Sequence, residues 1–164
     1  MKTLRSFLVA LVLLVANSGL AQKHHYFPLK DTTQTCVRLL FAGDAMQHST
    51  QYLWAWDKGT RQYNYEPNFR YLRPHLAKAD INIVNFETTL SGKPYGGYPK
   101  FRTPDAFFED MVDAGFQVFA LANNHILDGD KRGMKRTIKT IAPHPNLGAY
   151  MDTVQRREQY PLIF

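Results

Sequence analysis

Short apolar runs alternate with longer segments of helical spacing from residue 37 onward. The apolar runs are expected to be strands, and they cover residues 37–42, 80–86 and 116–122. Each run is nearly continuous in apolar residues, which is typical of parallel strands covered on both faces. The segments between the runs fit crossover helices. The pattern therefore predicts an α/β fold built from βαβ units around a mostly parallel sheet with flanking helices.

The expected helix before the third strand has readable ends. Thr103 is a good N-cap, Pro104 suits the first helical position, and Gly115 suits the position just after the last turn. Four apolar side chains recur between them at helical spacing: Phe107, Phe108, Met111 and Val112. This segment is therefore expected to pack one apolar stripe against the sheet.

Two further helical segments and a last strand are expected. One helix follows Gly133 and stops before Pro143. An earlier one covers residues 69–76, where Pro74 must kink the helix or begin a new turn. Residues 160–164 form a final strand candidate, and the chain ends there.

The N-terminal segment has the layout of a secretory signal peptide. Lys2 and Arg5 precede an apolar run at residues 7–16, and small residues at 19 and 21 suit cleavage after Ala21. The run is short for a membrane span, so export is favoured over an uncleaved anchor. The expected location is the periplasm, the cell envelope or the extracellular space.

The remaining chain is expected to be a polar, flexible leader at residues 22–36 and a single domain at residues 37–164. Removing residues 1–21 takes away Lys2 and Arg5 from the 20 basic side chains and none of the 14 acidic ones, which leaves a net charge of +4. This scattered charge suits an anionic small molecule or polymer as substrate, and nucleic acid is not an expected partner. Peripheral association with the envelope and the oligomeric state stay open.

Polar side chains of similar chemistry follow all three expected strands. They are Asp44, Glu87, Asn124 and His125, with His48 and Asp128 a few residues further along the chain. Because ligands bind beyond the carboxyl ends of parallel strands, the first four of these residues are expected to share one edge of the sheet. Carboxylates, an amide oxygen and an imidazole suit Mn, Fe, Zn or Mg. Such an ion would activate water, and His125 would protonate a leaving group.

Each of these residues alone also fits an ordinary structural role. A Gly-Asp pair after a strand is typical of a turn, and Asn123 and Asn124 are turn formers. Glu87 fits a helix cap or a solvated loop equally well. A single histidine is more often structural than catalytic. Their joint placement after three separate strands is what favours a functional site.

Two smaller features have open interpretations. Lys93, Lys100 and Arg102 lie in a Gly- and Tyr-containing loop that either grips an anionic substrate or is simply solvated. An aromatic group fits a stacking surface, although an ordinary core or lid is favoured. Its members are Tyr52, Trp54, Trp56 and Tyr63.

Three segments in order resemble the CapA-type poly-γ-glutamate capsule-synthesis family. They are FAGDAM at residues 41–46, ADINIVNFETTL at residues 79–90 and LANNHILD at residues 121–128. The resemblance covers residues 37–164 and implies a metallophosphoesterase-like layered fold of the calcineurin-like superfamily.

The resemblance also implies roles for the strand-end residues. By analogy, Asp44 and Glu87 are metal ligands, with Glu87 in the bridging position. Asn124 is a ligand of a second ion, His125 is the catalytic acid, and His48 is a further candidate ligand. The implied cofactors are divalent metal ions.

The chain departs from the family pattern in two ways. Where the family continues Asp-x-Gly-x-x-Gly, this chain has Asp130 at the middle glycine, which is expected to disturb the helix start unless Gly129 absorbs it. The superfamily also draws further histidine ligands from a second half, and no histidine follows His144. The domain is therefore expected to be incomplete at its C-terminus.

Two functions from different classes follow. The first is an exported protein of capsule or poly-γ-glutamate biosynthesis with a metal-assisted hydrolase site. The alternative is a non-catalytic accessory protein that handles or exports an anionic polymer, or an inactive fragment. Whether the chain is an enzyme stays open at this stage.

Overall fold

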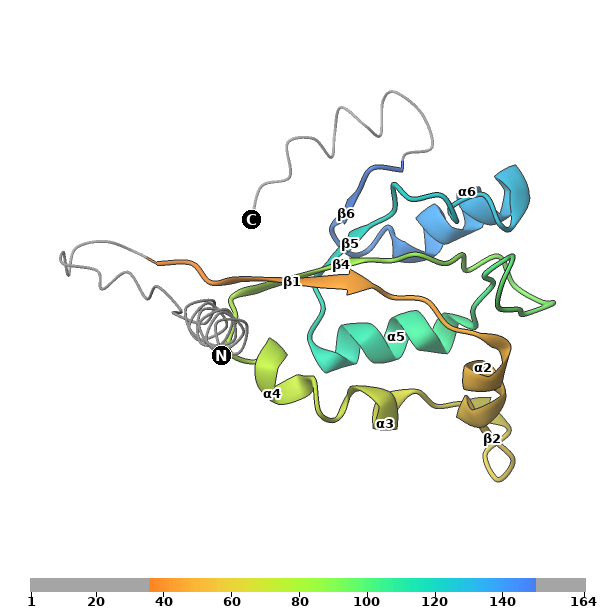
Figure 1. Cartoon of the computed structure of the whole chain (residues 1–164), viewed down its shortest axis with the longest axis horizontal. Helices are drawn as coiled ribbons and strands as arrows, with labels where there is room; N and C mark the ends of the chain where they lie inside the picture. Colours follow the sequence, from red (N-terminus) through yellow and green to blue (C-terminus); the bar gives the residue numbers. More distant parts are fainter. Residues whose placement is uncertain (1–35, 150–164) are drawn as a thin grey trace, which may run out of the picture. The chain divides into compact units, whose positions relative to one another are not determined.

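Four parallel strands form the main sheet of the computed structural model, which describes residues 36–149 (Figure 1). Across the sheet the order is β1 (Leu39–Asp44), β4 (Ile81–Asn85), β5 (Val118–Ala120) and β6 (Asn146–Leu147). The predicted parallel α/β sheet is confirmed, and its three expected strands are present with ends shifted by one to two residues. The pattern missed the two-residue strand β6. The predicted signal peptide, most of the leader and the strand at residues 160–164 lie outside the described residues.

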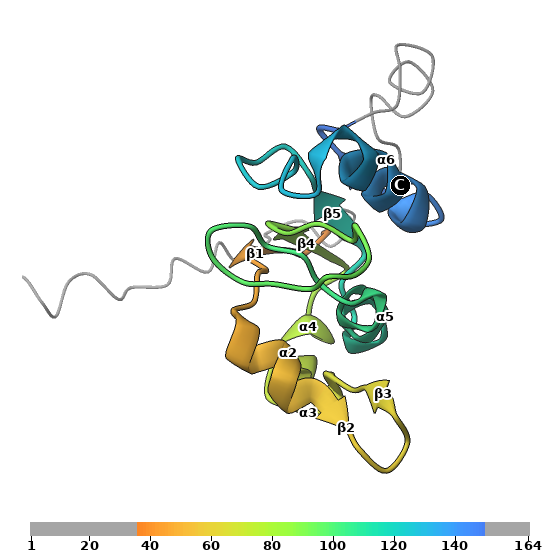
Figure 2. The ribbon, with the colours of Figure 1, turned by 90° about the vertical axis from the view of Figure 1, so that its right-hand side faces the viewer.

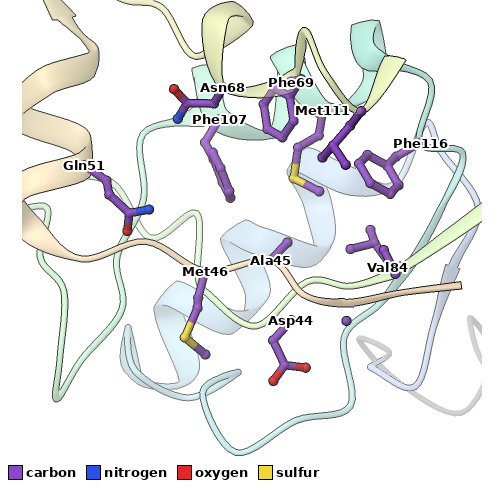
Figure 3. A pocket seen from close by; sticks show the side chains of 13 residues that line it. Asp44, Ala45, Met46, Gln51, Asn68, Phe69, Val84, Phe107, Met111 and Phe116 are labelled. Atoms are coloured by element: carbon purple, nitrogen blue, oxygen red, sulfur yellow. The ribbon is translucent and has the colours of Figure 1, made fainter. Parts of the chain in front are cut away.

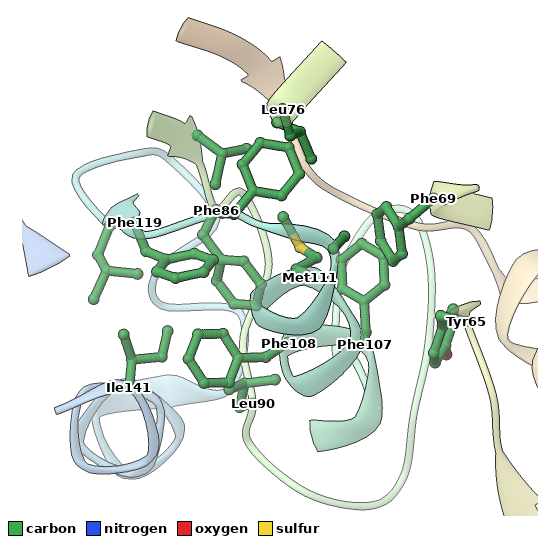
Figure 4. Close-up of a cluster of buried hydrophobic side chains, with 14 of the residues drawn as sticks. Tyr65, Phe69, Leu76, Phe86, Leu90, Phe107, Phe108, Met111, Phe119 and Ile141 are labelled. Carbon is green, nitrogen blue, oxygen red and sulfur yellow. The ribbon is translucent and has the colours of Figure 1, made fainter. Parts of the chain in front are cut away.

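Helices cover the two faces of this sheet. The helices α3 (Glu66–Phe69), α4 (Arg73–Leu76) and α5 (Asp105–Ala114) lie on one face, and α6 (Asp130–Ile141) lies on the other (Figures 1 and 2). The core contains six phenylalanines, together with Tyr65, Leu90, Met111 and the α6 residues Ile138 and Ile141 (Figure 4). Pro74 lies in the first turn of α4, so it begins a new helix, one of the two outcomes expected for it.

Only the C-terminal end of α5 is where the sequence predicted it. Gly115 follows the helix with φ of 117°, the left-handed conformation that glycine adopts most easily. The N-cap is Pro104, and the expectation of Thr103 was wrong. Thr103 is fully buried, and its hydroxyl pairs with the hydroxyl of Thr88 at 2.5 Å. That tertiary contact uses the oxygen that would otherwise cap the helix.

The start of α6 is earlier than expected, because the helix begins at Asp130 and includes Gly133. Asp130 itself adopts φ of 58°, so Gly129 does not absorb the change as the sequence suggested. Aspartate tolerates this left-handed conformation better than most residues. Gly129 and Gly133 instead allow close packing, because a Cβ on either would lie 2.4 or 2.7 Å from the Cβ of Ser91.

A helix and a hairpin connect β1 to α3, and the pattern did not predict them. They are α2 (Ser49–Ala55) and the antiparallel pair β2 (Trp56–Asp57) and β3 (Gln62–Tyr63). Figure 2 shows these three elements together, on the side of the sheet that carries α3 and α4. Among residues 36–149, no helix is both long enough and apolar enough to cross a membrane.

One face of β1 is open, contrary to the expectation that every strand would be covered on both faces. Leu40 and Ala42 pack toward the core, whereas Leu39 and Phe41 point to the opposite face and are 52% and 70% exposed. In the described part of the chain, β1 pairs only with β4 and is an edge strand. The open face therefore combines exposed apolar side chains with an unpaired strand edge, which favours association.

We predict that the paired substitution Leu39→Thr with Phe41→Thr makes the protein more monomeric. Threonine keeps a high strand propensity while removing apolar surface from the open face. Light scattering coupled to size exclusion would measure this, with the exposed loop substitution Leu127→Thr as the matched control. Association that persists in the double variant and falls in the control would contradict the assignment.

Candidate metal and acid–base site

Three neighbouring strands deliver polar side chains to one edge of the sheet. Asp44 is the last residue of β1, Glu87 follows β4 by two residues, and His125 follows β5 by five. Backbone bonds continue beyond the strands: the N–H of Phe86 donates to Ala120 and the N–H of Glu87 donates to Ala45, at 2.9 and 3.0 Å. This extended pairing holds the three strand ends side by side, as the parallel topology requires.

A bulge at Gly43 determines which way Asp44 points. Ala42 pairs with Val84, but Asp44 pairs with Asn85, so two steps along β1 match one step along β4. Side chains alternate between faces along a strand. The extra residue therefore moves Asp44 from the face of Val84, which is packed against α5, to the face of Asn85. Without the bulge, Asp44 would not meet the other strand-end residues.

The amide of Asn85 joins two carboxylates. Its Nδ2 donates to Asp44 Oδ1 at 2.8 Å and to Glu87 Oε2 at 2.6 Å. The two acceptor oxygens are therefore no further apart than the sum of these distances. Two negative charges this close repel each other, and the shared amide donor offsets that repulsion. The arrangement leaves one oxygen of each carboxylate free to bind another group.

Asn123, rather than Asn124, belongs to this network. The Asn123 amide nitrogen donates to Asn85 Oδ1 at 3.1 Å and to the Phe86 carbonyl at 3.0 Å. Its own Oδ1 accepts the His125 backbone N–H at 3.1 Å. Asn124 is exposed, and its side chain makes no hydrogen bond to the described residues. Asn123 thus orients both Asn85 and His125, while Asn124 faces solvent.

His125 is oriented by Asp128, three residues along the chain. His125 Nδ1 lies 2.7 Å from Asp128 Oδ2, which also accepts the Phe101 backbone N–H. An ionised carboxylate only accepts, so we assign the proton of the neutral ring to Nδ1. Nε2 then points toward Glu87, 4.0 Å from Oε1. The three side chains are 12–15% exposed, which shields their charges partly from water.

Phe101 places the loop of residues 91–102 over the site. Its ring contacts the His125 ring edge-on at 4.6 Å between centroids and the His48 ring at 5.4 Å. His48 precedes α2 and is exposed, and its backbone N–H donates to Gln51. His48 is therefore near the site through Phe101, with no hydrogen bond to Asp44 or Glu87.

The basic residues of the same loop separate into two groups. Arg102 is half-buried and donates from Nε to the Asp128 carbonyl at 3.0 Å, so it supports the loop that orients His125. Lys93 and Lys100 are exposed and make no ion pair with the described residues. Of the three basic side chains in this loop, Lys93 and Lys100 are the two that an anionic ligand from solution can reach.

The donor atoms suit a hard divalent ion in type but are few in number. Asp44 and Glu87 contribute carboxylate oxygens, and His125 Nε2 lies beside them. Within residues 36–149, however, no three His, Cys, Asp or Glu side chains are placed so that they could hold a metal ion. The cluster therefore matches part of a metal site in its chemistry, with Asn85 at its centre.

A separate pocket of about 300 Å³ lies between β1 and α5. Its lining is mostly apolar and includes Val84, Phe107 and Met111, with Gln51 and Asn68 on one side (Figure 3). The carboxylate of Asp44 points away from the aromatic side chains (Figure 3). The strand-end cluster and this pocket therefore use different sides of the chain at Asp44.

Sequence reasoning identified the strand ends but missed the residues that organise them. Asn85 and Asn123 occupy the last strand position and the following turn, where asparagine has several ordinary uses. Asp128 offered a clearer signal, because it lies three residues after His125 at a spacing that allows direct contact. The contribution of Phe101 depends on how its loop folds back, and no local pattern indicates that.

Replacing Asn85 with alanine is predicted to lower the free energy of unfolding by about 1–3 kcal/mol. The substitution removes the shared donor from two carboxylates and leaves their repulsion unopposed. The matched control is Asn124→Ala, which removes an exposed amide without a partner and should change stability by less than about 0.5 kcal/mol. Urea unfolding would measure both, and equal losses would contradict a bridging role for Asn85.

Comparisons with known proteins identify the family of this chain. The chain is 26% identical over 138 residues to the capsule biosynthesis protein CapA of Bacillus anthracis, an alignment that covers 79% of this chain. The chain spans about a third of that relative's length, because the match covers 32% of it. The model of the family described as "Bacterial capsule synthesis protein PGA_cap" matches residues 38–162, most of the sequence. The chain therefore belongs to the PGA_cap family of bacterial capsule synthesis proteins.

Proposed function

We propose that this chain is an exported protein of capsule biosynthesis whose strand-end cluster forms a metal-assisted hydrolase site. The observation that carries the proposal is the single Asn85 nitrogen that holds the Asp44 and Glu87 carboxylates beside His125. Membership of the capsule-synthesis family supports the biological role. The similarity to the capsule biosynthesis protein CapA of Bacillus anthracis supports that role further.

In this proposal the residues of the cluster divide the chemistry. Asp44 and Glu87 would hold a divalent ion through their free oxygens, and that ion would supply Lewis acidity and an activated water. In its doubly protonated form, His125 would give the Nε2 proton to the leaving group and return to the neutral ring with its remaining proton on Nδ1. Asp128 keeps Nδ1 protonated and stabilises the charged ring, and the low exposure of the pair strengthens that interaction. A phosphoester or a polymer amide bond fits this reaction class.

We expect a calorimetric titration to show that the chain binds Mn²⁺ weakly and that this binding depends on the carboxylates of Asp44 and Glu87. Asp44→Asn and Glu87→Gln each remove one charged ligand and should weaken binding at least about tenfold, a difference of about 1.4 kcal/mol. The matched controls are Asp113→Asn and Glu109→Gln, exposed α5 residues whose carboxylates have no partner in the described chain. Identical affinities in variants and controls would exclude this cluster as the metal site.

Hydrolysis provides the second arm of the same experiment. Asp44 and Glu87 supply fewer ligands than two ions usually need, so this chain should turn over an aryl phosphodiester slowly in Mn²⁺. His125→Gln should abolish this turnover while leaving Mn²⁺ affinity within a few fold. Fast turnover that survives His125→Gln would contradict the proposed role of the imidazole.

A non-catalytic function in handling an anionic polymer is the second candidate. Two observations favour it: no complete metal-ligand group occurs within residues 36–149, and Lys93 and Lys100 stay exposed on the loop above the cluster. Under this alternative, a γ-linked glutamate oligomer would bind without being cleaved. Its affinity would fall with salt and with Lys93→Gln or Lys100→Gln, because the contacts would be electrostatic.

Export generates a further prediction. The layout of residues 1–21 should direct cleavage after Ala21, so that the exported protein begins at Gln22. Mass spectrometry of the protein from the cell envelope and the medium would give the N-terminal residue directly. Intact protein beginning at Met1 in the membrane fraction would instead indicate an uncleaved anchor.

A further inference from the structure

A second hollow in the surface is walled by an exposed tryptophan. Trp54 lies on α2 and is 89% exposed, the highest value among the large apolar side chains of residues 36–149. It lines a hollow of about 680 Å³ together with residues of α2, the hairpin and α3. An exposed indole ring beside a hollow offers a flat surface on which a ligand can stack. Trp54 is therefore not part of a core, and a stacking surface, the other expected role of this aromatic group, fits its exposure.

The rest of the wall combines four polar residues with Ala55 and Pro67 and carries no charge. Besides Trp54, the lining residues are Thr50, Gln51, Ala55, Asn64, Pro67 and Asn68. Lys58 and Arg61, which lie in the hairpin turn, do not contribute to it. A site for an anionic polymer would need cationic side chains, and this wall has none. The hollow is therefore suited to an uncharged ligand.

Most of the polar groups in this wall are free to bind a ligand. Gln51 and Asn64 each accept one backbone N–H through the side-chain oxygen, at 2.6 and 2.9 Å, which fixes the amide and leaves its NH₂ group unused. The Thr50 hydroxyl and the Asn68 amide make no hydrogen bond to the described residues. The wall thus offers several donors and acceptors around one flat aromatic ring.

The scaffold that carries these groups is anchored to the core. Tyr65, fully buried between the hairpin and α5, packs edge-on against Phe107 at 5.1 Å, and its backbone N–H donates to Asp110. Burial raises the pKa of the Tyr65 hydroxyl, as expected for a group removed from water. Beside the hollow, the Asn64 N–H donates to Ala55, which ties the hairpin to α2. The wall is therefore largely pre-formed.

We propose that Trp54, Gln51, Asn64 and Asn68 form a binding site for an uncharged sugar residue of a glycan. A sugar ring presents a C–H face that stacks on an aromatic ring, and its hydroxyls both donate and accept hydrogen bonds. Flat indole surface, free amides and a hydroxyl are the groups that complement it, and the lack of charge matches a neutral ring. The site shares no residue with the carboxylate–histidine cluster and does not rest on its proposed chemistry.

Fluorescence tests this directly, because Trp54 and Trp56 are the two tryptophans of the chain. Trp56→Phe leaves Trp54 as the single reporter, and Trp54→Phe leaves Trp56, which packs against Tyr63 at 4.9 Å. Both proteins would be titrated with neutral tetrasaccharides: β-1,4-linked N-acetylglucosamine, β-1,4-linked glucose and α-1,4-linked glucose. Saturable quenching or a blue shift is expected only where Trp54 is retained.

Calorimetry on the full chain supplies the affinity. Trp54→Ala should weaken binding of the responsive tetrasaccharide at least about tenfold and Asn68→Ala by a smaller factor. Glu109→Gln, an exposed α5 side chain outside the hollow, should leave sugar binding unchanged, and Mn²⁺ affinity should be the same in all three variants. Saturable binding that depends on Trp54 supports the site.

Two outcomes would overturn the proposal. One is that none of the three tetrasaccharides saturates the wild-type chain below about 10 mM, the range of the weakest specific sites. The other is that a γ-linked glutamate oligomer binds in a Trp54-dependent way while the neutral sugars do not, which would assign the hollow to an anionic polymer. Circular dichroism of Trp54→Ala would verify that the variant is folded.

Discussion

The amide of Asn85 is the group on which the strand-end cluster depends, because it brings two like charges together. Asp44 and Glu87 come from different strands, and their carboxylates would move apart without a shared donor. The amide oxygen of Asn85 is in turn held by Asn123, which also fixes the His125 backbone. One side chain therefore couples the ends of β1, β4 and β5. Its position on β4 also requires the bulge at Gly43, since only then does Asp44 reach the same face.

This coupling explains how a small sheet can hold an acid–base group in place. The imidazole is supported from both of its ends: Asp128 takes Nδ1, and Glu87 lies near Nε2. Asp128 is itself fixed by the Phe101 N–H, so the loop over the site and the orientation of His125 are linked. The loop is held at its far side by the packing of Ser91 against Gly129 and Gly133. The arrangement is thus built from tertiary contacts between segments that are distant in the chain.

In the described domain, the charged side chains of the strand-end region and the neutral wall beside Trp54 are made of different residues. The carboxylates, His125 and the exposed Lys93 and Lys100 belong to the strand-end region and its loop. The wall beside Trp54 is neutral and rich in amides. The open face of β1 adds the exposed apolar side chains of Leu39 and Phe41 on the side of the sheet that also carries Asn85.

The amino-acid sequence by itself determined the α/β class, the order of three main strands and the strand-end residues Asp44, Glu87 and His125. Apolar runs and the polar residues that follow them can be recognised locally in the sequence. Because the strands are parallel, the residues that follow them lie at the same edge of the sheet. Gly115 at the end of α5 was equally local, because a left-handed residue favours glycine.

Only the tertiary structure decided the finer arrangement, because it depends on contacts between distant segments. Thr103 lost its expected capping role to a contact with Thr88, and Asn123 rather than Asn124 joined the network. The bulge at Gly43 depends on the register between two strands, which no pattern within one strand reveals. Trp54 lies in a run of aromatic residues that resembles a core, and its exposure follows from how α2 and the hairpin fold around the neutral hollow.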